Sequence, residues 1–344
     1  MKIQLFLYCL VASALVQAQN TVCFTIVANP NPTDPALSIF TKYVDVYGCS
    51  IYAEDGVTDE KVLHAAAIFA ELIDNDEDGI VDDPALLSEL QSKNALMPVF
   101  EADGNAAMNT FFNNYNGEGV SAVLWQTEID PSQPGHWGAD ATIEEILHTI
   151  NHVGHTNIYP SAFSFTPNSS LMTAAMDVAR GGQHLSVPAS YPPEAWYHYD
   201  DVSCDYGCMT IEYLYWSIVS LMGVLDDPAT CSGIANEWEP CSPTLFESMD
   251  TLMYQLITDP QYLLPQNAPD GNYCPVIPTD MEEPLISNME VFPNPSDGII
   301  TVSWKATPLV GEVKILNSLG QVVGKKGMTR LNSQMQLDLR HLSP

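Results

Sequence analysis

Residues 208–224 read CMTIEYLYWSIVSLMGV, a stretch that is apolar on nearly every face of a helix. A helix that is hydrophobic all round is buried, so we expect this segment to lie in the core of the protein. Its one carboxylate, Glu212, shares a face with four apolar or aromatic residues: Met209, Tyr215, Trp216 and Val219. A buried carboxylate is costly unless a cation or a metal ion lies beside it, which makes Glu212 a candidate metal ligand.

Other helical patterns precede and follow this segment. One begins at Thr58 (TDEKVLHAAAIFAELI), with Thr58 or Asp59 as the N-cap, and another begins at Pro84, a residue tolerated in a first turn. Further segments complete the prediction: helices at 142–153, 169–180 and 243–258, and short strands at 22–27 and 120–126. The predicted fold class is α+β, with a mostly α-helical body at 19–287 that contains a few strands.

The pattern changes after residue 287. Three segments alternate apolar and polar residues and are separated by Gly, Pro and Asn turns: VFPNPSDGIITVSW (291–304), GEVKILNSLGQVV (311–323) and QMQLDLRHL (334–342). Alternation of this kind is typical of strands with one buried face. We therefore expect a small all-β domain, an immunoglobulin-like sandwich, at 288–344.

The motif FPNPSDG (292–298), followed by an alternating strand and then by VKILNSLGQVV (313–323), resembles the C-terminal sorting domain of the type IX secretion system. The resemblance covers residues 288–344. It implies transport across an outer membrane, a secreted or cell-surface location, and the type IX secretion machinery as a partner. The family usually continues past a segment like LDLRHLSP with a glycine-led final strand, so we expect a domain truncated at Pro344.

The first residues predict export as well. MKIQLFLYCLVASALVQAQN places one lysine before an apolar run that ends in the small-residue pattern Val16-Gln17-Ala18. This is typical of a secretory signal peptide, here residues 1–18. The run is too short to span a bilayer, and no later segment offers some 20 consecutive apolar residues, so we predict no transmembrane helix.

The body is strongly acidic. Between residues 19 and 287 it has four basic residues, Lys42, Lys61, Lys93 and Arg180, against 39 acidic ones. Such a charge repels phosphate backbones and excludes nucleic acid as a partner. Metal cations are the expected counter-ions, although solubility in a salty medium also accounts for the charge without any function.

Seven cysteines remain after removal of the signal peptide, and export makes disulfides the expected state. Three pairs are close in sequence: Cys23 with Cys49, Cys204 with Cys208, and Cys231 with Cys241. One cysteine is then left over.

The segment DNDEDGIVDD (74–83) has the spacing of an EF-hand-type calcium loop, with Gly79 at the sixth position. The expected ligands are the carboxylates of Asp74, Asp76, Asp78 and Asp82 and the backbone carbonyl of Ile80. Ala85 stands where a bidentate Glu is usual, so a weaker site is expected, with Asp83 as a substitute ligand. A solvated acidic turn is the alternative, but repulsion among the carboxylates favours a calcium ion that joins two helices.

The segment EEILHTINHVGH (144–155) holds two carboxylates and three imidazoles. At 100° per residue Glu144, His148, His152 and His155 share one face of a helix, opposite an aliphatic stripe. His148 and His152 are spaced i, i+4, which lets two imidazoles reach one metal ion. The alternative is a solvated helix face, with Thr142 and Glu145 forming a capping box.

The same segment weakly resembles the zinc-peptidase helix HExxH. In EEILH (144–148) Glu144 takes the place of the first histidine, Glu145 that of the general base and His148 that of a ligand; in HTINH (148–152) Thr149 stands where the base is needed. The resemblance implies zinc or another divalent transition metal, with His148 as a ligand and Glu145 as the base. The shared helix face adds His152 and His155 as candidate ligands and Glu144 as an alternative base. A third ligand often comes from a carboxylate on a later helix, which favours Glu212.

Arg180 is the only arginine of the body, and it either pairs with Asp177 one turn earlier or holds a substrate carboxylate. The sequence therefore leaves three functions open. The first is a secreted metal-dependent hydrolase, with a peptidase favoured. The second is a non-catalytic, calcium-stabilised surface or adhesion protein. The third is an enzyme that acts on extracellular glycans through paired carboxylates.

Overall fold

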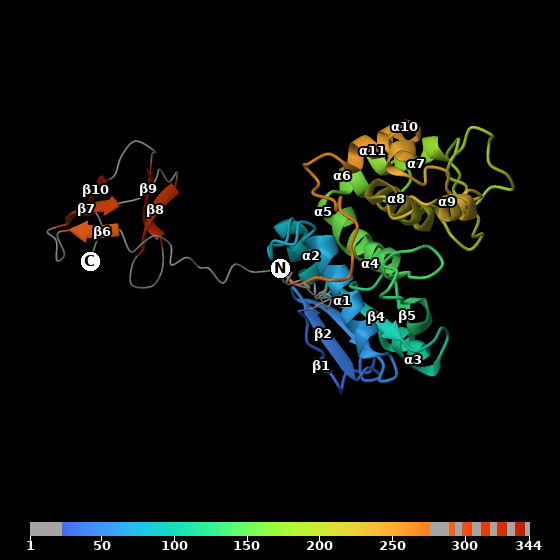
Figure 1. The fold of residues 1–344 in the computed structure, drawn as a ribbon, viewed down its shortest axis with the longest axis horizontal. Coiled ribbons are helices and arrows are strands. Elements are labelled where there is room, and N and C mark those ends of the chain that lie inside the picture. Colours follow the sequence, from blue (N-terminus) through green and yellow to red (C-terminus); the bar gives the residue numbers. More distant parts are fainter. Residues whose placement is uncertain are drawn as a thin grey trace, which may run out of the picture. The chain divides into compact units, whose positions relative to one another are not determined.

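The computed structural model describes residues 23–275, 289–292, 298–304, 311–316, 322–328 and 334–340 (Figure 1). The chain divides into two compact units, Met1–Pro275 and Val276–Pro344, which are described separately below. The predicted signal peptide, the predicted boundary at 287/288 and the predicted truncation at Pro344 lie outside the described residues.

The first unit contains a five-stranded sheet in the order β1-β2-β3-β4-β5. Its strands are β1 (Val27–Ala28), β2 (Lys42–Val46), β3 (Cys49–Ala53), β4 (Leu96–Phe100) and β5 (Leu124–Trp125). The first three strands are antiparallel, and β4 and β5 run parallel to β3. The hairpin between β2 and β3 turns at Tyr47 and Gly48, both of which have positive φ.

Eleven α-helical segments are described in this unit: α1 (Asp59–Ile73), α2 (Pro84–Ser92), α3 (Ala106–Asn114), α4 (Thr142–Ile150), α5 (Thr156–Ile158), α6 (Pro160–Phe163), α7 (Leu171–Ala179), α8 (Tyr206–Met222), α9 (Pro228–Ile234), α10 (Pro243–Met249) and α11 (Thr251–Ile257). A 3-10 turn spans Gln126–Glu128, and a π-helical turn spans Asn151–His155. The unit is therefore a mixed α/β structure.

The helices cover both faces of the sheet. On one face α1 packs against β2 and β3, and nearly all of its side chains from Val62 onward are buried. On the other face Phe111 of α3 packs with Phe40 and Phe100 in a second apolar core. Helix α4 contacts both α1 and α8, and α8 is packed against α7, α10 and α11 (Figure 1). The buried position expected for residues 208–224 is thus confirmed.

Several predicted elements differ in extent. The strand expected at 22–27 is limited to β1, and the one expected at 120–126 is limited to β5. The helix expected at 243–258 is two helices, because the chain turns at Asp250, whose carboxylate accepts a hydrogen bond from Met253 N at the start of α11. Strands β3 and β4 were not predicted, since nearly every residue in them is buried and no alternation marks them.

Two of the disulfides are those expected from the sequence, Cys204–Cys208 and Cys231–Cys241. The third expectation is wrong: Cys23 is bonded to Cys274, 251 residues away, and Cys49 is a buried free cysteine in β3. The antiparallel β1–β2–β3 path carries Cys49 into the core, whereas the segment before β1 runs beside Tyr273, whose carbonyl accepts a hydrogen bond from Cys23 N. Sequence separation alone cannot reveal such a contact.

In the second unit the described residues form two small antiparallel sheets. One has the order β10-β7-β6 and the other pairs β8 with β9. The strands are β6 (Met289–Phe292), β7 (Ile299–Trp304), β8 (Gly311–Leu316), β9 (Val322–Met328) and β10 (Gln334–Asp338). Val302 and Leu337 are buried between them, with Ile315 of β8 packed against this pair. The all-β character is as expected, and the immunoglobulin-like arrangement remains a prediction.

Candidate metal centre

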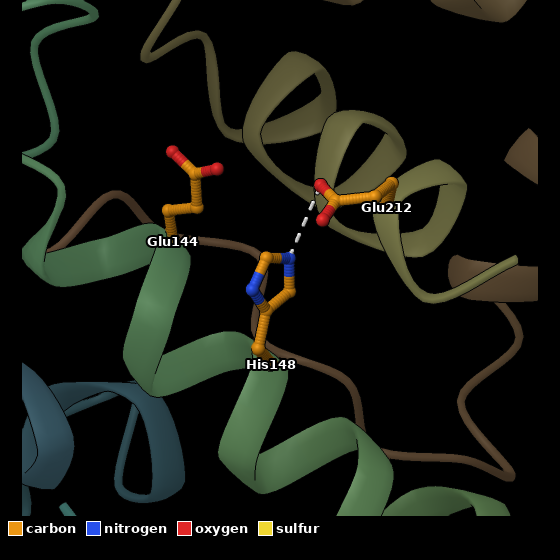
Figure 2. A group of neighbouring side chains, drawn as sticks. All are labelled: Glu144, His148 and Glu212. Carbon is orange, nitrogen blue, oxygen red and sulfur yellow. Dashed lines mark ion pairs between the residues drawn. The ribbon is translucent and has the colours of Figure 1, made fainter. Parts of the chain in front are cut away.

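Glu144 and His148 on α4 face Glu212 on α8 (Figure 2). One potential ligand atom from each residue lies within 4.8 Å of the other two. His148 Nε2 is 3.3 Å from Glu212 Oε2, and His148 Nδ1 is 3.6 Å from Glu145 Oε2. The structure thus brings together one histidine and three carboxylates from two helices.

The two helices position these side chains by simple periodicity. Glu144 and His148 are four residues apart, so both project from the same side of α4. Glu212 lies in the second turn of α8, which begins at the N-cap Asp205, whose Oδ1 accepts a hydrogen bond from Cys208 N. The disulfide Cys204–Cys208 spans this N-cap and the first turn of α8. The start of α8, and with it the position of Glu212, is fixed by a cap and a covalent bond.

The capping-box alternative for Glu145 is wrong. Thr142 is the first residue of α4 rather than its N-cap, and its hydroxyl donates to Asp140 Oδ1 at 2.7 Å. The N-cap is Ala141, which has no side-chain acceptor. Glu145 is therefore available to His148 and to the cavity beside it.

His152 and His155 do not join the group formed by Glu144, His148 and Glu212. The expectation assumed 100° per residue, but the helix widens into a π-turn at Asn151–His155, where each residue advances by a smaller angle. His155 is fully buried, and its Nδ1 is 2.9 Å from Asn151 Oδ1. His152 packs its ring against Phe165, with centroids 5.0 Å apart, and lines a cavity beside His148.

Burial and the neighbouring carboxylates shift the pKa values in this group. Burial raises the pKa of Glu144 to about 8, with Glu145 and Glu212 acting in the same direction. For His148, burial alone would lower the pKa, but the carboxylates of Glu212 and Glu145 hold it well above its ordinary value. Burial, followed by repulsion from His148, lowers the pKa of His152.

Tyr215 is a member of the site that sequence reasoning did not assign. Its hydroxyl acts on Glu144 in the direction that lowers the pKa of that carboxyl, and its ring packs edge-on against His148, with centroids 5.7 Å apart. It follows Glu212 by three residues and shares its helix face. Its position one helical turn after the carboxylate Glu212 is the sequence feature that could have pointed to Tyr215 as a site residue.

The donor set fits a divalent cation. Two carboxylates and an imidazole are ordinary ligands of zinc and of neighbouring transition metals. His148 Nε2 is buried and has no partner of hydrogen-bond geometry among the described residues, although it points toward Glu212. No lysine or arginine is among the described residues that line the two adjoining cavities. Glu144, His148 and Glu212 would be the ligands.

Two cavities adjoin this group and share Ser121, His148 and Glu212. The larger, about 650 Å³, continues past His152 and Phe165 to the start of α8. The smaller, about 400 Å³, is also lined by Glu144 and Glu145. The candidate ligands therefore lie where two open cavities meet.

Arg180 is not part of these walls. Its side chain is fully buried at the end of α7, where Nη1 donates to His184 O at 2.7 Å and Nη2 donates to Tyr191 Oη at 3.2 Å. Its guanidinium also lies over the Tyr191 ring, 5.5 Å from the centroid. Asp177 instead accepts hydrogen bonds from Tyr206 and Gln183, so the expected Arg180–Asp177 pair is not formed.

The acidic loop between α1 and α2 forms a second group. Carboxylate oxygens of Asp74, Asp76 and Asp78 lie within 4.8 Å of one another. Asp74 is buried and accepts a hydrogen bond from Gly79 N at 3.0 Å, and Gly79 has the positive φ of 87° that the sharp turn requires. Ile80 follows directly, with its side chain 69% exposed.

Two further acids of the loop lie outside this group of three. Asp82 Oδ2 accepts a hydrogen bond from Asn75 N at 2.8 Å and is outside the group of three. Asp83 Oδ1 caps α2 through Ala85 N and Leu86 N, and Asp83 Oδ2 accepts from Tyr159. The role expected for Asp83, a substitute for the twelfth ligand, stays a prediction; both of its oxygens accept hydrogen bonds, as do both oxygens of Asp74 in the same loop.

Comparison with known proteins identifies the second unit. Residues 290–344 match the family described as Secretion system C-terminal sorting domain. This region is a type IX secretion sorting domain, so the protein is delivered to the cell surface or the extracellular space through that machinery. No curated protein and no solved structure matches the chain. No helix among the described residues is both long and apolar enough to cross a bilayer.

Proposed function

We propose that this secreted protein is a divalent-metal-dependent hydrolase that cleaves peptides. The observation that carries the proposal is the meeting of Glu144, His148 and Glu212 at the junction of two open cavities. The spacing of Glu144, Glu145 and His148 on α4, with a third ligand from α8, follows the HExxH register rather than the one based on His148 and His152.

In this proposal each residue has one role. Glu144, His148 and Glu212 hold the cation, which would supply Lewis-acid polarisation of a substrate carbonyl. Glu145 takes a proton from the attacking water and later transfers it to the leaving amine. Tyr215 would donate its hydroxyl to Glu144 and so keep this ligand in place. The contact of Glu145 with His148 Nδ1 orients the imidazole so that Nε2 points toward Glu212.

The test is Glu145→Gln, which keeps the size of the side chain but cannot accept the proton. Peptide hydrolysis by the metal-loaded protein should fall by a factor of about 10²–10⁴, while metal content is unchanged. Glu60→Gln, at an exposed position in the first turn of α1, is the matched control and should retain full activity. Equal activity in the two variants would exclude Glu145 as the base. Cleavage of glycans but not peptides would instead support the glycan-active alternative.

We further propose that calcium binds between α1 and α2 and stabilises the body. Asp74, Asp76 and Asp78 supply the carboxylates, and the Ile80 carbonyl is the next ligand by the EF-hand spacing. The support is the convergence of three acidic side chains, one of them fully buried. If this ion alone is bound, the protein is the calcium-stabilised surface protein of the second hypothesis.

A further inference from the structure

The lining of the larger cavity beside His148 and Glu212 contains a second acidic residue, Asp205. Asp205 lines this cavity together with apolar side chains, among them Phe165, Leu185 and Ile211. Asp205 is exposed, and it is the N-cap of α8, where Oδ1 accepts from Cys208 N at 3.0 Å. Asp205 is thus held in place by its bond to the helix terminus, and it is an exposed residue of the cavity lining.

The smaller cavity has a different character. Its described lining includes Met108, Phe112, Val123 and Trp125, and the only carboxylates there are those of the metal centre. Phe112 is 52% exposed at this wall, and Leu185 is 60% exposed at the wall of the larger cavity. Exposed apolar side chains on both sides of the ligands suit a chain-like substrate that contacts both cavities.

The distance along α8 from Glu212 to Asp205 decides which substrate side chain can reach Asp205. Asp205 and Glu212 are seven residues apart, which is about 10 Å along the helix and nearly the same face. An extended peptide advances about 3.3 Å per residue. A lysine or arginine next to the cleaved bond could therefore bring its charged end to Asp205. Its methylene stem would lie against Phe165 and Ile211, as long cationic side chains do on apolar surfaces.

Charge favours the same occupant. The described residues that line the two cavities include Asp205 and the carboxylates of the metal centre but no lysine or arginine. The acidic body attracts cationic segments and repels anionic ones at long range.

We propose that the larger cavity is a specificity pocket for a lysine or arginine side chain of the peptide substrate, and that Asp205 recognises its charge. This inference rests on the proposed peptidase activity, which it deepens. Peptides with a basic residue adjacent to the cleaved bond are the preferred substrates, and those with an acidic residue there are the poorest.

The test compares three peptides that are identical except for lysine, norleucine or glutamate at that position. We expect the metal-loaded wild-type protein to cleave the lysine peptide with a kcat/KM about tenfold or more above that of the norleucine peptide. Asp205→Asn removes the charge but keeps a good N-cap, and Asp205→Ser is a second variant with the same property. Both should lower the ratio of kcat/KM for the lysine peptide to that for the norleucine peptide to about one. Asp201→Asn, at an exposed position near the same turn and outside both cavities, is the matched control.

Binding of the same labelled peptides to the Glu145→Gln protein gives an independent readout, because it needs no turnover. Tighter binding of the lysine peptide that is abolished by Asp205→Asn supports the pocket. Equal binding and equal cleavage of lysine and norleucine peptides overturn the pocket while leaving the peptidase intact. Absence of cleavage of every peptide overturns the proposed function, and the binding comparison then decides separately whether Asp205 recognises a basic side chain.

Discussion

Glu144 and His148 are one helical turn apart, and this spacing explains why they, rather than His148 and His152, face Glu212. The first register lies wholly within the regular helix α4, whereas the second enters the π-turn at Asn151–His155. The residue pattern made His148 and Glu212 candidate ligands and both glutamates candidate bases, whereas the geometry groups Glu144 with the candidate ligands. Sequence reasoning could not exclude His152 and His155, because a change of helical pitch has no mark in the residue pattern.

Arg180 provides a test at the same scale. The planar guanidinium of Arg180 donates to both His184 O and Tyr191 Oη. A lysine has one ammonium group and cannot reproduce this pair of contacts. Arg180→Lys should lower the free energy of unfolding by about 1–3 kcal/mol, as expected for lost buried charge-assisted hydrogen bonds. Denaturant unfolding measures this, and KM of the remaining folded protein should not change. A raised KM for substrates with a free carboxylate, at unchanged stability, would instead restore a substrate-binding role.

Among the elements, the loop 74–83 joins α1 to α2 and also contacts a distant segment. Tyr273 donates a hydrogen bond to Asp74, and Asn75 Oδ1 accepts from Gln266 N and Asn267 N, both at 2.7 Å. An ion in this loop would therefore stabilise two helices and the segment that precedes Pro275. The local sequence pattern was enough to predict an acidic loop between two helices. The contact of this loop with a segment 191 and 192 residues after Asn75 could not be predicted, because it depends on the three-dimensional fold.

Asp76→Asn tests the calcium proposal. Calcium at about 100 times its Kd should stabilise the wild-type protein by about 2.7 kcal/mol, because it binds only the folded state. The variant should lose most of this stabilisation, and Asp103→Asn, at an exposed position before α3, should keep it. Thermal unfolding with calcium and with a chelator measures the difference. An undiminished calcium effect in Asp76→Asn would contradict the assignment.

Helix α1 is tied to the same distant segment through Glu71. This carboxyl is 1% exposed, and its Oε2 accepts hydrogen bonds from Asp270 N at 2.6 Å and Gly271 N at 3.0 Å. Burial outweighs these contacts and raises the pKa of Glu71 from 4.5 to about 7. The folded state therefore binds the Glu71 proton more tightly than the unfolded state does.

The sign of the resulting pH dependence follows from proton linkage. Between pH 4.5 and about 7 the folded state binds the Glu71 proton and the unfolded state does not, so this contribution to stability is complete below pH 4.5 and is lost as the pH rises through 7. As the pH rises over this range, the unfolding free energy of Glu71→Gln should fall by about 1–3 kcal/mol less than that of the wild-type protein. Urea unfolding at pH 5 and at pH 8 measures this change in unfolding free energy, and a chelator in both buffers removes any contribution from bound metal. Exposed Glu239→Gln should keep the wild-type slope, and an unchanged slope in Glu71→Gln would contradict the burial argument.

The sheet was the part of the fold that sequence pattern predicted least well. Local periodicity was sufficient for α1, α2 and α8, whose predicted and observed bounds differ by few residues. Strands β3 and β4 are buried on both faces, and β4 contains Pro98, so neither alternation nor composition marks them. The pairing of Cys23 with Cys274 follows from the same long-range arrangement.

At the scale of the whole molecule, the chain combines an acidic body with a sorting domain at residues 290–344. Export by this route explains the disulfides and is compatible with weak calcium binding, since extracellular modules bind calcium at low affinity. All proposed ligands, the base and the specificity residue lie within Met1–Pro275. The sorting domain accounts for location, and the proposed chemistry belongs to the body.

The most direct test of this account is the transition-metal content of the secreted protein. After zinc loading and removal of excess ion, elemental analysis should find one equivalent in the wild-type protein and in Asp76→Asn. His148→Ala and Glu212→Gln should each lose most of it, because they remove ligands from different helices. Calcium as the only bound metal, or zinc retained in both ligand variants, would contradict the metal centre formed by Glu144, His148 and Glu212.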